Sequence, residues 1–397
     1  MLIRAGELKS LMEAAGNPLA AADRVCEAIH EAVKAKKVDP LSEQFAREVS
    51  IKSIAEAVCG RDWVESLGRR GGPLIAEGVS AVNSSAFANI IGQIAYSMVN
   101  AAFGRSGLAE LNIVPTVPTP FNGEKIPRLA NISPDGSTVT EGQEAPLTGF
   151  GESWVTTPST QRDALRIGLT REAVIFDRTG QLQSQARSVG EAIAQRKAIK
   201  ILRVIAGIDN TFSEDGTTTN TYLTSGARTN ARSSAALADW SSIDGAMQLW
   251  TKMTDPATGY PIVIPGTGAV LLVPPALAMI GNRILTATTV RTTTNTATQE
   301  TEWGNPLAGQ FTVVASSLMR WLIRNPGGQN DAVSDGRWFF GYPSKAFAYM
   351  ENWPLTVEVA GPQHADVFNR DLVGVYKATE RGVCAVIDPR YIVRNDA

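Results

Sequence analysis

The sequence predicts a mixed α+β fold in which a long extended segment leads directly into one long helix. Proline and glycine recur through residues 113–158 and mark turns, and the valine, threonine, isoleucine and leucine between them favour short strands. Over residues 178–207 the apolar residues recur instead at three- and four-residue spacing, which is typical of an amphipathic helix. Residues 336–397 are again rich in strand-forming residues.

The extended segment is unusually long for a connection inside a compact domain. Loops of this length are normally functional, disordered, or hairpins that reach a partner. We favour a hairpin over residues 113–169, because the composition alternates between turn formers and strand formers. Such a hairpin is too long to bury its side chains in its own domain.

The helical periodicity that follows has a distinct apolar side. Leu182, Ala186, Val189 and Ile193 recur on it, and Gly207 is expected to end the helix because it lacks a side chain. The residues assigned to the polar side are Arg187, Glu191, Arg196, Lys197, Lys200 and Arg203.

The rest of the chain divides into helical and extended stretches. We predict several helices within residues 1–70, the clearest over 41–60, and another helix over 82–102. The later predictions are a surface loop over 211–230, a helix over 239–253, a strand over 269–275 followed by a helix to 285, and a strand over 311–315.

Composition indicates a soluble protein with no general attraction for nucleic acid. The 397 residues are 44% hydrophobic, so the chain can bury a large core, and 37 Lys and Arg nearly balance 39 Asp and Glu. Cys26, Cys59 and Cys384 are too few and too scattered for a disulfide framework, which fits a reducing cytoplasm. We expect no signal peptide, because the first residues lack an apolar signal-peptide core. We expect no contact with a membrane, because no apolar run is long enough to span a bilayer.

Residues that could carry chemistry do not form a recognisable site. His30 and His364 lie far apart without nearby metal-ligand spacing, so we expect neither a zinc site nor a catalytic triad. Asp209, Glu214 and Asp215 crowd one segment, but their spacing matches no calcium loop. We therefore predict no catalytic, cofactor-binding or metal-binding residues and no enzymatic activity. The aromatic residues expected to anchor a core or an interface are Trp303, Trp321, Trp338, Phe339 and Phe340.

The order of these segments resembles the major capsid proteins of tailed bacteriophages, which have the Hong Kong 97 fold. The resemblance covers residues 79–397, and it rests on the order and spacing of its motifs. Those motifs are SAFANIIG at 85–92, TREAVIFD at 170–177, WFFGY at 338–342, LTVEV at 355–359, ERGV at 380–383 and DPR at 388–390.

The resemblance implies a division of the chain and a function. The expected parts are an N-terminal helical extension at 1–78, an arm and helix at 79–112, an extended loop at 113–169, a peripheral domain with the spine helix at 170–210, an inserted axial domain at 211–335, and closing strands of the peripheral domain at 336–397. The protein would assemble with itself as pentamers and hexamers into an icosahedral head. That head would enclose double-stranded DNA without sequence-specific binding, with a portal protein and possible cement, decoration or scaffolding proteins as further partners. We expect it in the virion capsid, and in the host cytoplasm during assembly.

Some members of this family join subunits covalently, through a lysine on the extended loop and an asparagine on a neighbour, with a nearby glutamate assisting. Lys125 is the only lysine of the extended loop. The positions that correspond to the asparagine and the glutamate hold Leu372 and Thr379. We therefore expect Lys125 to be a solvated or salt-bridging residue at the tip of the loop, and a shell held by non-covalent contacts or an accessory protein.

Three other functions remain open from the sequence. An encapsulin-like compartment would have the same fold but would enclose enzyme cargo. An enzyme would need a catalytic constellation that the sequence lacks. A secreted adhesive protein would account for the threonine-rich segments, but would need a signal sequence.

Overall fold

The computed structural model describes residues 98–104, 107–129, 141–142, 144, 152–170, 181–226, 228–255, 259–264, 268–293, 300–324, 333–360 and 372–397. The predicted helices within 1–70, residues 82–97 of the predicted helix at 82–102, and residues 171–177 of the motif at 170–177 lie outside these residues. Residues 98–104 are helical, in agreement with the predicted helix. The chain divides into two compact units. Unit 1 includes residues 162–196 and 353–381 and unit 2 includes 108–161, 197–352 and 382–397.

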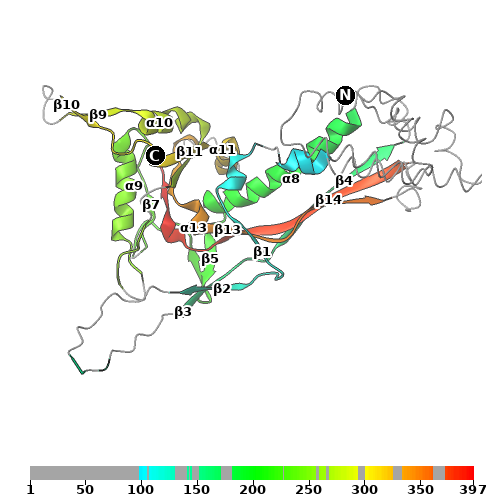
Figure 1. Ribbon diagram of the computed structural model, residues 1–397, viewed down its shortest axis with the longest axis horizontal. Helices are drawn as coiled ribbons and strands as arrows, with labels where there is room; N and C mark the ends of the chain where they lie inside the picture. Colours follow the sequence, from blue (N-terminus) through cyan, green and yellow to red (C-terminus); the bar gives the residue numbers. More distant parts are fainter. Residues whose placement is uncertain are drawn as a thin grey trace, which may run out of the picture. The chain divides into compact units, whose positions relative to one another are not determined.

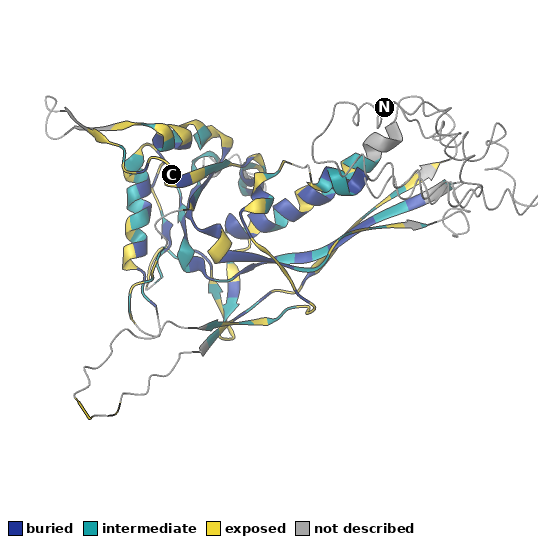
Figure 2. Cartoon of the chain, in the orientation of Figure 1, coloured by how far each residue is buried: buried dark blue, intermediate teal, exposed yellow. Residues whose placement is uncertain are grey.

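Unit 2 is built around a five-stranded sheet in the order β11-β8-β12-β15-β7. The first pair, β11 with β8, is parallel, and β12 pairs antiparallel with both β8 and β15. The strands are β7 (Ala231–Arg232), β8 (Ala269–Val273), β11 (Phe311–Ala315), β12 (Trp338–Gly341) and β15 (Ile392–Asn395). All four residues of β12 are buried, so the centre of the sheet forms the core of the unit (Figure 2).

Helices α9 (Trp240–Lys252) and α10 (Pro275–Thr286) pack on this sheet. Asp239 begins α9 as its N-cap, with its side chain accepting from the Ser241 N–H, and Trp250 stacks on Phe340 with ring centroids 5.3 Å apart. Helix α10 approaches the sheet closely at Gly281, where an added Cβ would lie 3.1 Å from a Leu271 side-chain carbon.

Several short helices and the hairpin of β9 and β10 also belong to this unit (Figure 1). They are η1 (Ala109–Asn112), α11 (Ser317–Arg324), α12 (Val333–Gly336), α13 (Pro343–Ala346), η2 (Pro389–Tyr391), β9 (Thr289–Thr293) and β10 (Glu300–Gly304). In the parts of the chain that the structure describes, every helix is too short or too polar to cross a lipid bilayer.

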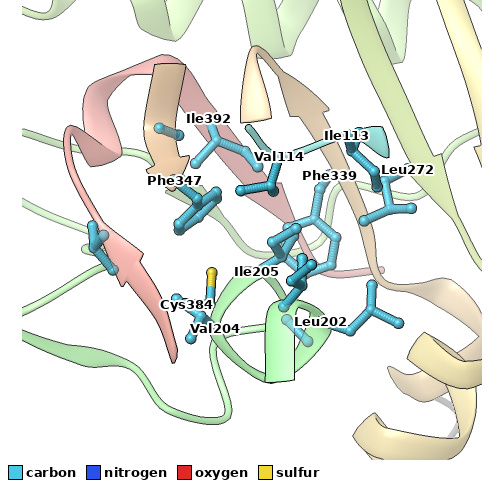
Figure 3. Packing of buried hydrophobic residues seen from close by; sticks show 14 of the residues in the cluster. Ile113, Val114, Leu202, Val204, Ile205, Leu272, Phe339, Phe347, Cys384 and Ile392 are labelled. Carbon is cyan, nitrogen blue, oxygen red and sulfur yellow. The ribbon is translucent and has the colours of Figure 1, made fainter. Parts of the chain in front are cut away.

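The predicted long helix is α8 (Gln181–Ile205), and it runs from unit 1 into unit 2. Gly207, with a φ of 70°, follows it as predicted. Leu202 and Ile205 pack in the same cluster as Phe339 and Ile392 (Figure 3).

Lys197 corrects one detail of the predicted polar side of α8. Lys197 is only 7% exposed. Its Nζ lies 2.8 Å from Glu351 Oε1 and 4.4 Å from the centroid of the Tyr349 ring. The prediction that Lys197 lies on the polar side was wrong because Glu351, whose carboxylate pairs with its ammonium, comes 154 residues later in the sequence. A buried ammonium is tolerated only with such a partner.

Unit 1 contains the other part of α8 and parts of three long strands. The strands belong to a four-stranded sheet in the order β1-β13-β14-β4. Within unit 1 a small core holds Val99, Ile193 and Ala378, and an added Cβ on Gly190 would lie 2.4 Å from the Val99 carbonyl oxygen. The strands are β1 (Thr116–Pro118), β4 (Gln161–Thr170), β13 (Phe347–Ala360) and β14 (Leu372–Val386).

The α+β class is confirmed. The predicted helices at 239–253 and 276–285 and the predicted strands at 269–275 and 311–315 are present, with ends that agree within a few residues.

The predicted surface loop at 211–230 is wrong in part, because β5 (Thr211–Glu214) and β6 (Thr217–Asn220) form a hairpin there. The predicted closing segment 336–397 is distributed over both units, since β12 and β15 pair within the sheet of β8. The domain boundaries inferred from the sequence stay predictions.

Candidate functional site: the base of the β2–β3 hairpin

The predicted hairpin is present at its base, where β2 (Lys125–Leu129) pairs antiparallel with β3 (Glu152–Thr156). This base is part of a second four-stranded sheet within unit 2, in the order β2-β3-β5-β6 (Figure 1). Residues 141–142 form a turn between the two strands, and Gly142 there has a φ of 87°. The described ends of the extended segment are therefore paired as the base of a hairpin.

The two faces of the β2–β3 ribbon differ in burial. Lys125 and Trp154 lie on the outer face, where Trp154 is 37% exposed and the Lys125 Nζ lies 5.2 Å from its ring centroid. Val155 lies on the opposite face, is 1% exposed, and belongs to the main core cluster. Burying this face anchors the hairpin in the unit, since apolar contact of this kind contributes about 25 cal/mol per Å².

A tight turn joins β5 to β6 next to the hairpin. Asp215 and Gly216 both have positive φ, 51° and 79°, as a two-residue type I′ turn requires. The Asp215 N–H donates to the Trp154 carbonyl at 2.9 Å, and the Trp154 N–H donates to Asp215 Oδ1 at 2.8 Å. The turn is thus hydrogen-bonded to the hairpin strand β3.

Glu214 lies between two arginines that come from different segments. Arg128 of β2 approaches Glu214 Oε1 at 2.8 Å, and Arg228 approaches Oε2 at 3.2 Å. All three side chains are about four-fifths buried. Burial lowers the pKa of the Arg228 guanidinium below its usual value, and the charge of Glu214 opposes that shift. The pairing links β2 to β5 across the intervening strand β3.

The corner that precedes β2 is fixed by side-chain hydrogen bonds. Thr119 Oγ1 donates to Glu124 Oε2 at 2.8 Å, and the Thr160 N–H donates to Asn122 Oδ1 at 2.8 Å. Asn352 Nδ2 donates to the carbonyl oxygens of Thr119 and Phe121, both at 2.9 Å. The corner holds the Phe121 side chain 61% exposed.

Asp209, Glu214 and Asp215, which crowd one segment of the sequence, each contact a different partner in the structure. Asp209 accepts hydrogen bonds from Arg203 at 2.9 and 2.8 Å, which raise the pKa of that guanidinium. Glu214 contacts arginines and Asp215 contacts a backbone amide, so the three carboxylates serve different partners. Among the residues that the structure describes, no three His, Cys, Asp or Glu side chains are placed to hold a metal ion.

Lys125 does not lie at the tip of the hairpin, as the sequence suggested, but at its base opposite Thr156. The position was misjudged because the pairing of β2 with β3 cannot be read from the extended segment alone. Thr379 is 5% exposed and its Oγ1 lies 2.8 Å from Thr356 Oγ1, and Leu372 packs where Gly168 leaves room for it. His30 and His364 lie outside the described residues.

The predicted aromatic anchors divide into two groups. Trp338, Phe339 and Phe340 are at most 2% exposed, which confirms their role in the core. Trp303 and Trp321 are more than half exposed. The residues that sequence reasoning missed at this site are Arg128, Arg228 and the turn at Asp215, although an Asp-Gly pair flanked by strand formers is itself a hairpin signal.

Comparison with known proteins identifies the class of protein. The model of the family described as phage capsid protein matches residues 154–395, more than half of the chain. The chain belongs to this family, which confirms the prediction of a phage capsid protein. Its place is accordingly in a virion capsid.

Similar solved structures have low sequence identity to this chain. The capsid protein of cyanophage Pam1 is 11% identical, with a TM-score of 0.44 and coverage of 70% of this chain and 84% of that chain. A chain from mycobacterium phage Che8 is 14% identical, with a TM-score of 0.43 and coverage of 72% and 90%. A virus-like particle from Pyrococcus furiosus is 9% identical, with a TM-score of 0.42 and coverage of 76% and 98%. None of the curated proteins matches the sequence.

Proposed function

We propose that this major capsid protein assembles through its β2–β3 hairpin into pentamers and hexamers that close as an icosahedral head around double-stranded DNA. The hairpin of one subunit lies over a neighbouring subunit and adds strand pairing and apolar burial that the isolated subunit lacks. Each subunit engages several neighbours, so individually weak contacts combine into a durable shell.

The observation that carries this proposal is the asymmetry of the hairpin. Its base is paired, ion-paired and buried within unit 2, whereas residues 130–151 separate the last paired residues, Leu129 and Glu152, in the sequence. A long segment rich in proline and glycine is not expected to form a core of its own. A neighbouring subunit is the partner that membership of the capsid family implies.

The role is structural rather than enzymatic. A portal protein, and possible cement, decoration and scaffolding proteins, are the expected additional partners, and assembly takes place in the host cytoplasm. The net charge of −2 fits a shell that encloses DNA without a general attraction for it.

We predict that no isopeptide bond joins the subunits. Lys125 stacks on Trp154 of its own hairpin, and Leu372 and Thr379 occupy the positions where the joining and assisting groups would be needed. Particles boiled in denaturant should therefore run at the monomer mass of 42.4 kDa on gels. A ladder of heavier species that vanishes in Lys125→Ala, but persists in the control Lys252→Ala, would contradict this.

The encapsulin-like alternative has weaker support, and the contents of the particles separate it from a phage head. Particles isolated from cells that produce the complete phage should contain double-stranded DNA protected from added nuclease. Particles that hold a folded enzyme and no protected DNA would overturn the proposal in favour of a cargo compartment.

A further inference from the structure

The pairing between β3 and the β5–β6 turn has an unusual acceptor. Val155 lies opposite Glu214 and Thr156 opposite Ser213, so the register places Trp154 opposite Asp215. An antiparallel pair of this kind normally exchanges two backbone hydrogen bonds. Here the Asp215 N–H makes one of them, to the Trp154 carbonyl, but the Trp154 N–H donates to the Asp215 carboxylate at 2.8 Å.

The conformation of Asp215 explains this substitution. Its φ of 51° begins the turn, so the chain reverses at the point where a continuing strand would offer its carbonyl oxygen. The carboxylate takes the place of that carbonyl. It thereby extends the pairing of β3 with this segment by one residue, to Trp154.

We propose that Asp215 is a positioning residue for shell assembly, whose carboxylate fixes the direction in which the hairpin leaves the subunit. This inference rests on the proposed role of the hairpin in contacting a neighbour. A hairpin whose base is already fixed loses less conformational freedom when it docks than one that pivots at Trp154, and pre-organisation of this kind favours binding.

The contact is suited to positioning more than to stabilising the fold. The hydrogen bond from Trp154 to Asp215 is exposed, and the Trp154 side chain is 37% exposed. The apolar anchor of the hairpin is Val155, which packs in the main core cluster, and Asp215 is not part of that cluster. Loss of the carboxylate should therefore loosen the hairpin while the subunit stays folded.

Two substitutions at Asp215 distinguish the effect of its carboxylate from the effect of its turn conformation. Asp215→Gly keeps the positive φ and the backbone N–H but removes the acceptor, whereas Asp215→Asn tolerates the same φ and keeps a side-chain oxygen. Asp209→Ala is a matched control, because it removes a carboxylate from the same connection that pairs only with Arg203 in the described contacts. Full-length proteins would be compared by sedimentation and electron microscopy over a range of subunit concentrations.

We expect Asp215→Gly to raise the subunit concentration needed for shell formation about tenfold, as loss of one hydrogen bond would. Asp215→Asn and Asp209→Ala should stay within about twofold of the wild type. In the free subunit, hydrogen exchange at the Trp154 amide should be about tenfold faster in Asp215→Gly only, with melting temperatures of all variants within a few degrees.

Three outcomes would overturn the inference. If Asp215→Gly and the wild type both assembled normally, the positioning role of Asp215 would be contradicted, and the proposed function would not be. Loss of assembly in Asp215→Asn equal to that in Asp215→Gly would mean that the oxygen acceptor is not what matters. A wild type that forms no shell when produced with the other virion proteins would contradict the proposed function itself.

Discussion

Replacing residues 130–151 by a short Gly-Ser linker is expected to leave a folded subunit that forms no normal shell. The replacement begins after Leu129 and ends before Glu152, so the pairing of β2 with β3 and of β3 with β5 is retained. The contacts removed are those that the distal hairpin would make with neighbours, and losing all of them at once removes a multivalent contribution. A larger replacement of 120–160 would also delete β2 and β3, and would confuse folding with assembly.

Folding and assembly are measured separately for this variant. The melting temperature of the free subunit should stay close to that of the wild type, because Val155 and the ion pair of Arg128 with Glu214 remain. Micrographs should show no closed particles. Normal shells in those micrographs would mean that the hairpin is not the assembly element.

The second large effect is expected in the core, from Trp338→Ala. Trp338 is fully buried in β12, and its Nε1 donates to the Ala235 carbonyl at 2.7 Å. Replacing a buried tryptophan by alanine costs about 3–5 kcal/mol, and the Ala235 oxygen would also lose its partner. The free energy of unfolding should fall by about 4 kcal/mol in denaturant titrations of the free subunit.

Trp303→Ala provides the matched control for this prediction. Trp303 is 59% exposed, so the same chemical change should alter the free energy of unfolding by less than about 1 kcal/mol. Equal destabilisation by the two substitutions would contradict the assignment of Trp338 to the core.

Elements with a strong local pattern were predictable from the sequence. Helices α8 and α9 follow from apolar spacing and from their ends, since Gly207 follows α8 and Asp239 caps α9. Strand β8 follows from an unbroken apolar run before two prolines. In each case the residues that specify the element lie within it or next to it.

Features that depend on distant partners were not predictable in this way. Lys197 looks like a surface residue until Glu351 is placed beside it, and Lys125 looks like a tip residue until β2 pairs with β3. The hairpin of β5 and β6 was hidden in a threonine-rich stretch, because both strands are short and β6 is mostly exposed. The candidate site is made of such long-range pairings, so the sequence indicated the hairpin but not the residues that hold it.

The most direct test is a cryo-electron microscopy reconstruction of purified particles, in which the path of residues 130–151 is traced. We predict a closed icosahedral shell in which this segment of every subunit lies against a neighbouring subunit, with β2 and β3 still paired at its base. A closed shell in which the segment folds back on its own subunit, or particles that lack closed symmetry, would contradict the proposed mode of assembly.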